Sequence, residues 1–132
     1  MAREIIQPNS VHSTPGVGYS HVAKAGDTFY IAGQIALDVD GNLVGKGDIE
    51  AQVHQAYANL QAILDELGGS LDDIVKMTTY LTDRSQLDAF RRVRDRFFSD
   101  PFPPNTLLFI SGLAHPDYLI EVEAVAVLTC VQ

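Results

Sequence analysis

The alternation of apolar and polar residues near the end of the chain predicts a β-strand from Leu119 to Leu128. One face of this strand would carry only apolar side chains, namely Ile120, Val122, Ala124, Ala126 and Leu128. The other face would carry Glu121 and Glu123, about 7 Å apart along the strand, beside Leu119, Val125 and Val127. A carboxylate on a buried face is costly unless it is paired or hydrogen-bonded. This face therefore either meets water or holds the two carboxylates for a function.

Two stretches repeat apolar residues at helical spacing. The first predicted helix runs from Asp48, a good N-cap, to Leu67, and Gly68 and Gly69 end it. Its apolar stripe consists of Ile49, Val53, Ala56, Leu60, Ile63, Leu64 and Leu67. The second predicted helix opens at Ser85 and runs to about Phe98, and its buried side would be Leu87, Phe90, Val93 and Phe97. Each helix therefore has one face to bury.

Further strands are predicted at residues 19–23, 28–36 and 74–82, the last because it is rich in β-branched residues. Gly33 lies inside the second of these strands, which predicts a bulge or a close approach to the backbone there. Another strand follows Pro103, and a tight Gly/Pro/Asp connection would join it to the final strand. Residues 1–18 contain many Pro, Gly, Ser and Asn residues and predict an extended lead-in without an element. The turn at 40–42 predicts a hairpin between residues 35–37 and 43–44.

The order of these elements predicts a single α+β domain over residues 1–132. Because each helix links two strands and has a single apolar stripe, both helices should cover the same face of one sheet. The other face would stay open. Its strands are apolar enough that a bare face would form a larger exposed patch than monomers normally tolerate, which favours oligomerisation through that face.

Composition excludes several classes of function. The chain has 132 residues and a formal net charge of −8, which argues against a protein that wraps nucleic acid or binds membranes through basic residues. Its lone cysteine, Cys130, cannot form an internal disulfide, and residues 1–10 lack the apolar core of a signal peptide. No apolar run of the roughly 18 residues that span a membrane is present. We therefore expect a cytoplasmic protein.

The side chains that could carry chemistry show few local motifs. The four histidines, at positions 12, 21, 54 and 115, have no metal-ligand spacing, so we expect neither a metal ion nor another cofactor. Four arginines lie on the second helix, at positions 91, 92, 94 and 96. They fit a solvated helix face paired with nearby acids. The functional alternative is that Arg91 turns towards a bound anion.

Four stretches of the sequence, in order along the chain, resemble the Rid family (also called the YjgF or UK114 family). They are GYSHV at 18–22, FYIAGQI at 29–35, LDDIVKMTTYLTD at 71–83, and PPNTLL with EVEAVAV between 103 and 127. The resemblance implies a chorismate-mutase-like fold of the bacillus type, with two helices on one face of the sheet. It also implies a homotrimer around a central β-barrel, with small-molecule clefts between neighbouring subunits.

The activity that this resemblance implies is hydrolysis of the carbon–nitrogen bond of enamines and imines, such as 2-aminoacrylate, to 2-keto acids and ammonia. Tyr19, Gly33 and Glu121 match the family pattern, with Glu121 as the expected catalytic residue and the other two as substrate-binding residues. Four other expected binding positions depart from that pattern. Asn105 stands where the family has an Arg and Leu107 where it has a Cys, while Ala32 replaces a Ser and Arg91 a helix Asn.

Asn105 supplies no charge for a substrate carboxylate, and this leaves two hypotheses open. In the first, Arg91 replaces the missing clamp in an enamine or imine deaminase. In the second, Asn105, Leu107 and Phe109 form a more apolar pocket around Glu121 for a less anionic molecule. The protein would then be either a deaminase of a ring-cleavage, aminomuconate-type compound or a non-catalytic, regulatory metabolite-binding trimer. A ribonuclease is disfavoured by the net charge of −8.

Overall fold

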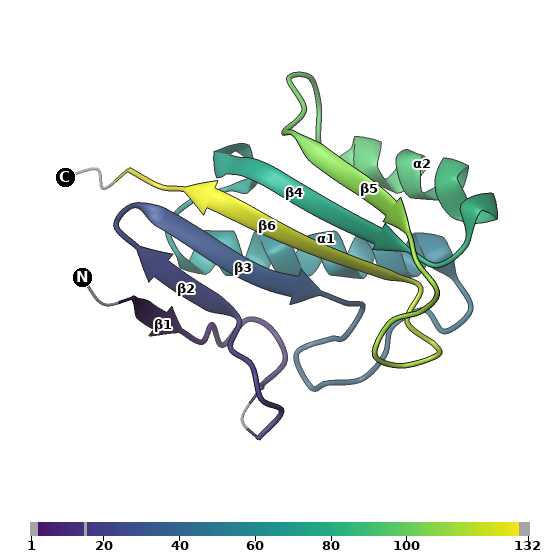
Figure 1. The fold of residues 1–132 in the computed structure, drawn as a ribbon, viewed down its shortest axis with the longest axis horizontal. Helices are drawn as coiled ribbons and strands as arrows, with labels where there is room; N and C mark the ends of the chain where they lie inside the picture. The colour runs from purple at the N-terminus through teal and green to yellow at the C-terminus, as the bar shows by residue number, and fades with distance from the viewer. Residues whose placement is uncertain (1–2, 15, 130–132) are drawn as a thin grey trace.

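The computed structural model describes residues 3–14 and 16–129 and shows one sheet with helices packed on one side (Figure 1). Two α-helices, α1 (Ile49–Glu66) and α2 (Leu87–Phe97), both lie behind the sheet in this view. The strands within these residues are β1 (Glu4–Ile6), β2 (Val22–Ala25), β3 (Thr28–Gln34), β4 (Ile74–Leu81), β5 (Asn105–Phe109) and β6 (Ile120–Val127). The predicted α+β class, with both helices on one face, is confirmed.

The six strands form a single mixed sheet in the order β1-β2-β3-β6-β4-β5. All neighbouring pairs are antiparallel except β4 and β5, which are parallel. The prediction that a tight connection joins the last two strands was therefore wrong. Strand β4 lies between them, and residues 110–119 cross over it to bring the chain from β5 to the centre of the sheet.

Three other sequence predictions need correction. Residues 1–18 were predicted to hold no element, but Glu4–Ile6 forms the edge strand β1 by pairing with β2. The second strand begins at Val22 and not at residue 19, so Tyr19 lies in the loop before it. The predicted hairpin around residue 41 is reduced to one bridge, between Leu37 and Leu43. For β1 and β2, pairing with another strand decides the structure, and local propensity does not report such pairing.

The core lies between the sheet and the two helices. Asp48 caps α1 by accepting a hydrogen bond from the Ala51 N–H, as the sequence predicts. The predicted stripes are confirmed, because the helix positions named above are buried or pack against the core. The only additions within α1 are polar or aromatic residues, namely Gln52, Tyr57 and Asn59.

Two of these buried side chains, Gln52 and Asn59, hold the chain at one end of the central strands β6 and β3. Gln52 donates to the Asp117 carbonyl at 2.9 Å and accepts from the Leu119 N–H at 2.9 Å, so it holds the chain just before β6. Asn59 donates to the carbonyls of Ile35 and Leu37 just after β3, both at 3.0 Å. Helix α1 thereby sets where the two central strands start and end.

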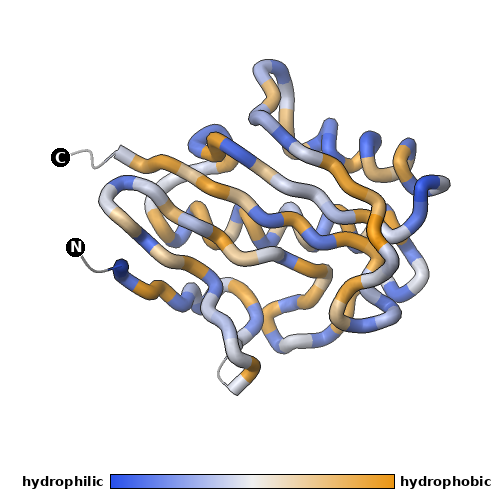
Figure 2. Tube along the Cα trace, viewed as in Figure 1, coloured by the Kyte–Doolittle hydropathy of each residue, from blue (hydrophilic) through white to orange (hydrophobic). Residues whose placement is uncertain are grey.

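The face of the sheet away from the helices is open in the single subunit. As predicted, Ile120, Val122, Ala124 and Ala126 point into the core, whereas Glu121 and Glu123 do not. We call this surface the open face. It mixes exposed apolar residues with polar ones. Figure 2 shows apolar and polar residues along the strands of the sheet as a whole. Its exposed apolar members include Ile5, Tyr30, Leu108 and Val127.

Candidate active site

Glu121 lies on the open face, against an irregularity in the neighbouring strand β3. Ile31 pairs with Ala124 and Gln34 pairs with Val122, so two residues of β3, Ala32 and Gly33, stand opposite one residue of β6. This is a β-bulge, a feature that is common beside active sites. It confirms the prediction that a glycine inside this strand marks a bulge or a close approach.

The close approach at Gly33 is made by the Glu121 side chain. A Cβ atom at position 33 would lie 2.6 Å from the Glu121 Cδ and 2.7 Å from its Cγ. Real carbon atoms in contact stay about 3.5–4.0 Å apart. The Glu121 carboxylate therefore occupies the space that a side chain at position 33 would fill.

Burial raises the pKa of the Glu121 carboxyl, and the nearby negative charge of Glu123 raises it further. Glu123 is the more exposed of the two and accepts a hydrogen bond from the Tyr80 hydroxyl at 2.8 Å. This bond raises the pKa of Tyr80, so the Tyr80 hydroxyl stays protonated. A raised pKa makes the Glu121 carboxylate a stronger base than an exposed glutamate.

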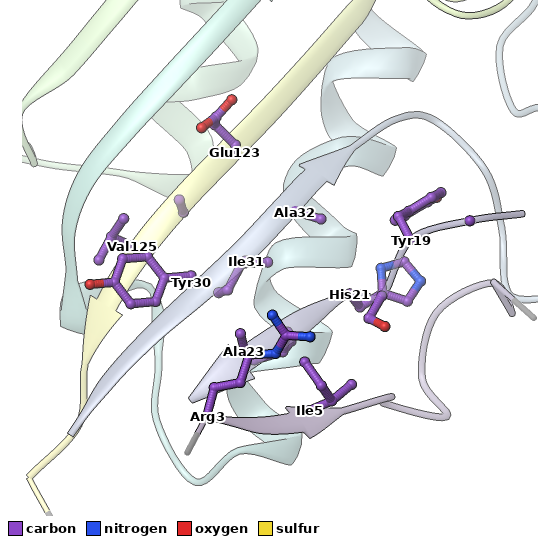
Figure 3. Close-up of a pocket in the computed structure, with 14 residues that line it drawn as sticks. Arg3, Ile5, Tyr19, His21, Ala23, Tyr30, Ile31, Ala32, Glu123 and Val125 are labelled. Atoms are coloured by element: carbon purple, nitrogen blue, oxygen red, sulfur yellow. The ribbon is translucent and has the colours of Figure 1, made fainter. Parts of the chain in front are cut away.

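Tyr19 lies in the loop before β2 and is among the labelled side chains that line the pocket in Figure 3. It contributes to a groove of about 470 Å³ on the open face, whose lining also includes Arg3, Tyr30, Ala32 and Glu123. Burial and then Glu121 raise the pKa of the Tyr19 hydroxyl, which therefore stays protonated. Glu121 does not line this groove in the single subunit, but it lies next to Glu123 on the same face of β6. Tyr19, Ala32, Gly33 and Glu121 together are called the glutamate half-site below.

The predicted residues on β5 lie on the opposite face of the sheet. Asn105, Leu107 and Phe109 pair in register with Met77, Thr79 and Leu81 of β4, which are buried under the helices. The side chains of Leu107 and Phe109 accordingly pack against the core. We call these three β5 residues the asparagine half-site. Within one subunit it does not meet Glu121, so the predicted apolar pocket around Glu121 does not form there.

Asn105, but neither Leu107 nor Phe109, lines a small cavity of about 70 Å³ beside α2. The Thr79 hydroxyl donates to the Asn105 Oδ1 at 2.9 Å, which fixes the side-chain amide. The cation at this cavity is Arg94, whose guanidinium also lies 5.2 Å from the centre of the Phe102 ring. Sequence reasoning missed Arg94, although its position three residues after Arg91 puts both on one side of the helix.

Arg91 does not line this cavity. Its side chain is about half exposed and lies 3.8 Å from the Asp88 carboxylate. This fits the solvated-face interpretation of the helix arginines, and the role of Arg91 as a substitute clamp stays a prediction. Within residues 3–14 and 16–129, no group of three or more His, Cys, Asp or Glu side chains could hold a metal ion. Cys130 lies outside the described residues.

His12 is a further residue of the site that the sequence did not indicate. It is 5% exposed, and its Nε2 lies 3.1 Å from the Tyr19 hydroxyl oxygen. The sequence showed only that the four histidines lack metal-ligand spacing, which gave no reason to link His12 to Tyr19. A hydrogen bond between two loop residues leaves no periodic pattern in the sequence.

An open sheet face with a half-buried carboxylate beside a bulge, and helices on the other face, defines a class of small α+β proteins. The family model described as Endoribonuclease L-PSP matches residues 11–128. The chain belongs to this family, which is the Rid or YjgF/UK114 family. The resemblance inferred from the sequence is thereby confirmed.

Named relatives match over almost their whole length. The chain is 36% identical to a RutC family protein of Pyrococcus abyssi, over 96% of this chain and 98% of that one. It is 32% identical to the 3-aminoacrylate deaminase RutC of Acinetobacter baylyi, over 96% and 98%. It is 28% identical to a 2-iminobutanoate/2-iminopropanoate deaminase of Dermatophagoides farinae, over 93% and 99%. Two of these three relatives are thus named as deaminases of enamines or imines.

The fold is also found among solved structures. The crystal structure of RidA from the Antarctic bacterium Psychrobacter has a TM-score of 0.86 and 30% sequence identity, covering 95% of this chain and 99% of that one.

No helix in the described part of the chain has the length and apolar character to cross a membrane.

Proposed function

We propose that this protein hydrolyses a small enamine or imine, such as 2-aminoacrylate and its imine tautomer, and releases ammonia. The observation that carries the proposal is the Glu121 carboxylate, half-buried in the space left by Gly33, with a raised pKa and the Tyr19 hydroxyl nearby. The relatives named as 3-aminoacrylate and 2-iminobutanoate/2-iminopropanoate deaminases support the same class of reaction.

The reaction needs one water molecule and one base. Glu121 accepts a proton from the water as its oxygen bonds to the imine carbon, the C=N electron pair moves to nitrogen, and Glu121 passes the proton on to that nitrogen to give a carbinolamine. Glu121 then accepts the hydroxyl proton of the carbinolamine and delivers it to the nitrogen as the C=O bond forms and the C–N bond breaks, so that the nitrogen leaves as ammonia. The products are a 2-keto acid and ammonia, so the elements of the imine and one water are conserved. Tyr19 and the backbone of the β3 bulge hold the polar atoms of the substrate.

We infer that the reaction takes place between subunits. The glutamate half-site lies on the open face and the asparagine half-site on the helix-covered face, so one subunit cannot place both around one small ligand. A homotrimer in which the edge strand β5 of one subunit reaches the open face of the next would unite them. Exposed apolar residues on the open face, such as Tyr30 and Leu108, support burial of this face.

The decisive experiment is a coupled assay. A PLP-dependent dehydratase generates 2-aminoacrylate in situ, and the formation of pyruvate and ammonia is followed with and without this protein. We expect the protein to accelerate both and the Glu121→Gln variant to lose the acceleration. Absence of any acceleration by the natural protein, across 2-aminoacrylate and larger or neutral imines, would refute the deaminase function.

The same assay decides which cation holds a substrate carboxylate. Arg94 lines the cavity at Asn105, and Arg91 pairs with Asp88. Arg94→Ala should raise KM for 2-aminoacrylate, whereas Arg91→Ala should do so only if Arg91 turns into the cleft of the assembled protein. Arg92→Ala is the control, because Arg92 is exposed and pairs with Glu50.

A second candidate is supported by Asn105. This residue carries no charge, so the cleft would suit a less anionic ligand, either an aminomuconate-type substrate of a deaminase or a metabolite that is bound without reaction. Under this hypothesis the natural protein would bind such a ligand saturably but leave 2-aminoacrylate untouched. Asn105→Arg would then confer activity on 2-aminoacrylate.

A further inference from the structure

A chain of buried polar groups connects the loop before β2 to the bulge that holds Glu121. The His21 Nε2 lies 2.7 Å from the His12 carbonyl oxygen, and the Gln34 Nε2 lies 3.1 Å from the His21 Nδ1. The same Gln34 nitrogen donates to the Ala32 carbonyl at 3.1 Å, and the Ala32 N–H donates to the His21 carbonyl at 2.8 Å. Because a carbonyl only accepts, His21 must carry its proton on Nε2. The backbone of His12 is therefore tied to the bulge.

The His12 side chain faces Tyr19 from this fixed position. Burial lowers the pKa of His12, and the neighbouring His21 lowers it further, so the ring is neutral and carries one proton. Its Nε2 lies 3.1 Å from the Tyr19 hydroxyl oxygen, and its Nδ1 is buried without a hydrogen-bond partner among the described residues. The ring thus has two possible tautomers, which differ in the atom that is left unpaired.

The two tautomers give Tyr19 opposite roles. With the proton on Nδ1, a buried N–H would have no acceptor among the described residues, and Tyr19 would donate to Nε2. With the proton on Nε2, His12 donates to Tyr19, and only a lone pair on Nδ1 is unpaired. Unpaired buried N–H groups are rarer in proteins than under-satisfied acceptors. The second tautomer is therefore favoured, and it leaves the Tyr19 proton free for another acceptor.

We propose that His12 is a positioning residue that donates from Nε2 to the Tyr19 oxygen and so directs the Tyr19 O–H into the cleft, towards the substrate. Tyr19 is 40% exposed and lines the groove on the open face, so its hydroxyl can meet a ligand that binds there. The hydroxyl then donates to an electron-rich group of an imine substrate, either its carboxylate or the nitrogen that becomes ammonia. This inference rests on the proposed function only for the identity of that acceptor.

The tautomer can be measured without any substrate. The ¹⁵N and ¹H correlations of a protein labelled at its histidine rings distinguish Nε2–H from Nδ1–H, and the spectrum of the His12→Gln variant assigns the His12 signals. We expect the Nε2–H form for His12. An Nδ1–H form would overturn the proposal, because Tyr19 would then be the donor. This readout stands even if the protein has no deaminase activity.

The coupled assay tests the consequence for turnover. His12→Leu removes the donor and should lower kcat/KM about tenfold, the size of one lost hydrogen bond. His12→Gln places an N–H near the position of Nε2 and should retain activity within about threefold, since its neutral hydrogen bond is similar in strength. The control is His54→Gln, the same substitution at an exposed position of α1, which should leave activity unchanged.

A double-mutant cycle separates this role from a purely structural one. In the Tyr19→Phe background, His12→Leu should cause no further loss, because the hydroxyl that His12 positions is already absent. Equal losses in both backgrounds would overturn the proposal and leave His12 as a packing residue. Failure of the wild-type protein in the assay would instead refute the proposed function, while the ring tautomer would still decide the role of His12.

Discussion

Replacing Gly33 with alanine would insert one methyl group into the space occupied by the Glu121 side chain. The new Cβ would lie 2.6 Å from the Glu121 Cδ, whereas ordinary carbon contacts are about 3.5–4.0 Å. The carboxylate must therefore move by about 1 Å or more, and a displacement of that size from a reacting position can cost about 100-fold in rate. We expect kcat/KM of Gly33→Ala to fall by about this factor.

The folded state should tolerate this change. The φ of Gly33 is not in the left-handed region, so alanine fits the backbone, and Gly→Ala at a compatible site stabilises by about 0.4–1 kcal/mol through the unfolded chain. A Glu121 side chain forced away from its preferred rotamer costs about 0.5–1.5 kcal/mol, which roughly offsets this gain. The free energy of unfolding should thus change by less than about 1 kcal/mol.

The coupled 2-aminoacrylate assay and urea unfolding measure the two quantities separately. Gly112→Ala is the matched control, because a Cβ there meets no atom within 4 Å and its φ is also outside the left-handed region. A Gly33→Ala variant that keeps activity within about threefold would refute the reasoning, because the expected displacement of about 1 Å would then have no catalytic cost. Loss of activity together with large destabilisation would show that the methyl group disrupts the strand and not the carboxylate alone.

Three further predictions concern the carboxylate, the core and the open face. Because burial raises the pKa of Glu121, the wild-type protein should lose stability as the pH rises through that pKa. In urea titrations, Glu121→Gln should therefore be more stable than the wild type at pH 7 and equal to it below about pH 4. A wild-type advantage at neutral pH would contradict this sign. Gln52→Ala removes three buried hydrogen bonds to the backbone and should lower the free energy of unfolding by about 2–4 kcal/mol, against little change for Gln61→Ala on the exposed side of α1. Tyr30→Asp places a charge on the open face and should shift the sedimentation profile towards a smaller species while circular dichroism stays constant; an unchanged assembly would exclude this part of the face from the interface.

Much of the fold could be predicted from local patterns. The alternation along β6 correctly put the two glutamates on one face and Ile120, Val122, Ala124 and Ala126 on the other. The helical stripes predicted both helices, and the single stripe on each correctly implied that they cover the same face. Gly33 inside an apolar strand correctly indicated a bulge. These features follow from periods of two and 3.6 residues and from the properties of single residues, which are visible in any short window of sequence.

The arrangement of the site could not be predicted in the same way. Alternation along β5 cannot show that its neighbour is the parallel strand β4 and not β6, and this pairing decides that Asn105 faces away from Glu121. No local pattern shows that Arg94 shares a cavity with Asn105 while Arg91 does not.

The sequence by itself thus determined which side chains share a face of each element, because side-chain direction is set by the backbone of that element alone. Only the tertiary structure decided which side chains meet. It brings His12 into hydrogen-bonding distance of Tyr19, packs Glu121 against Gly33 and separates the two half-sites. These contacts depend on how the loops and strands are placed relative to one another, and the balance of strand pairing and burial over the whole fold selects that placement.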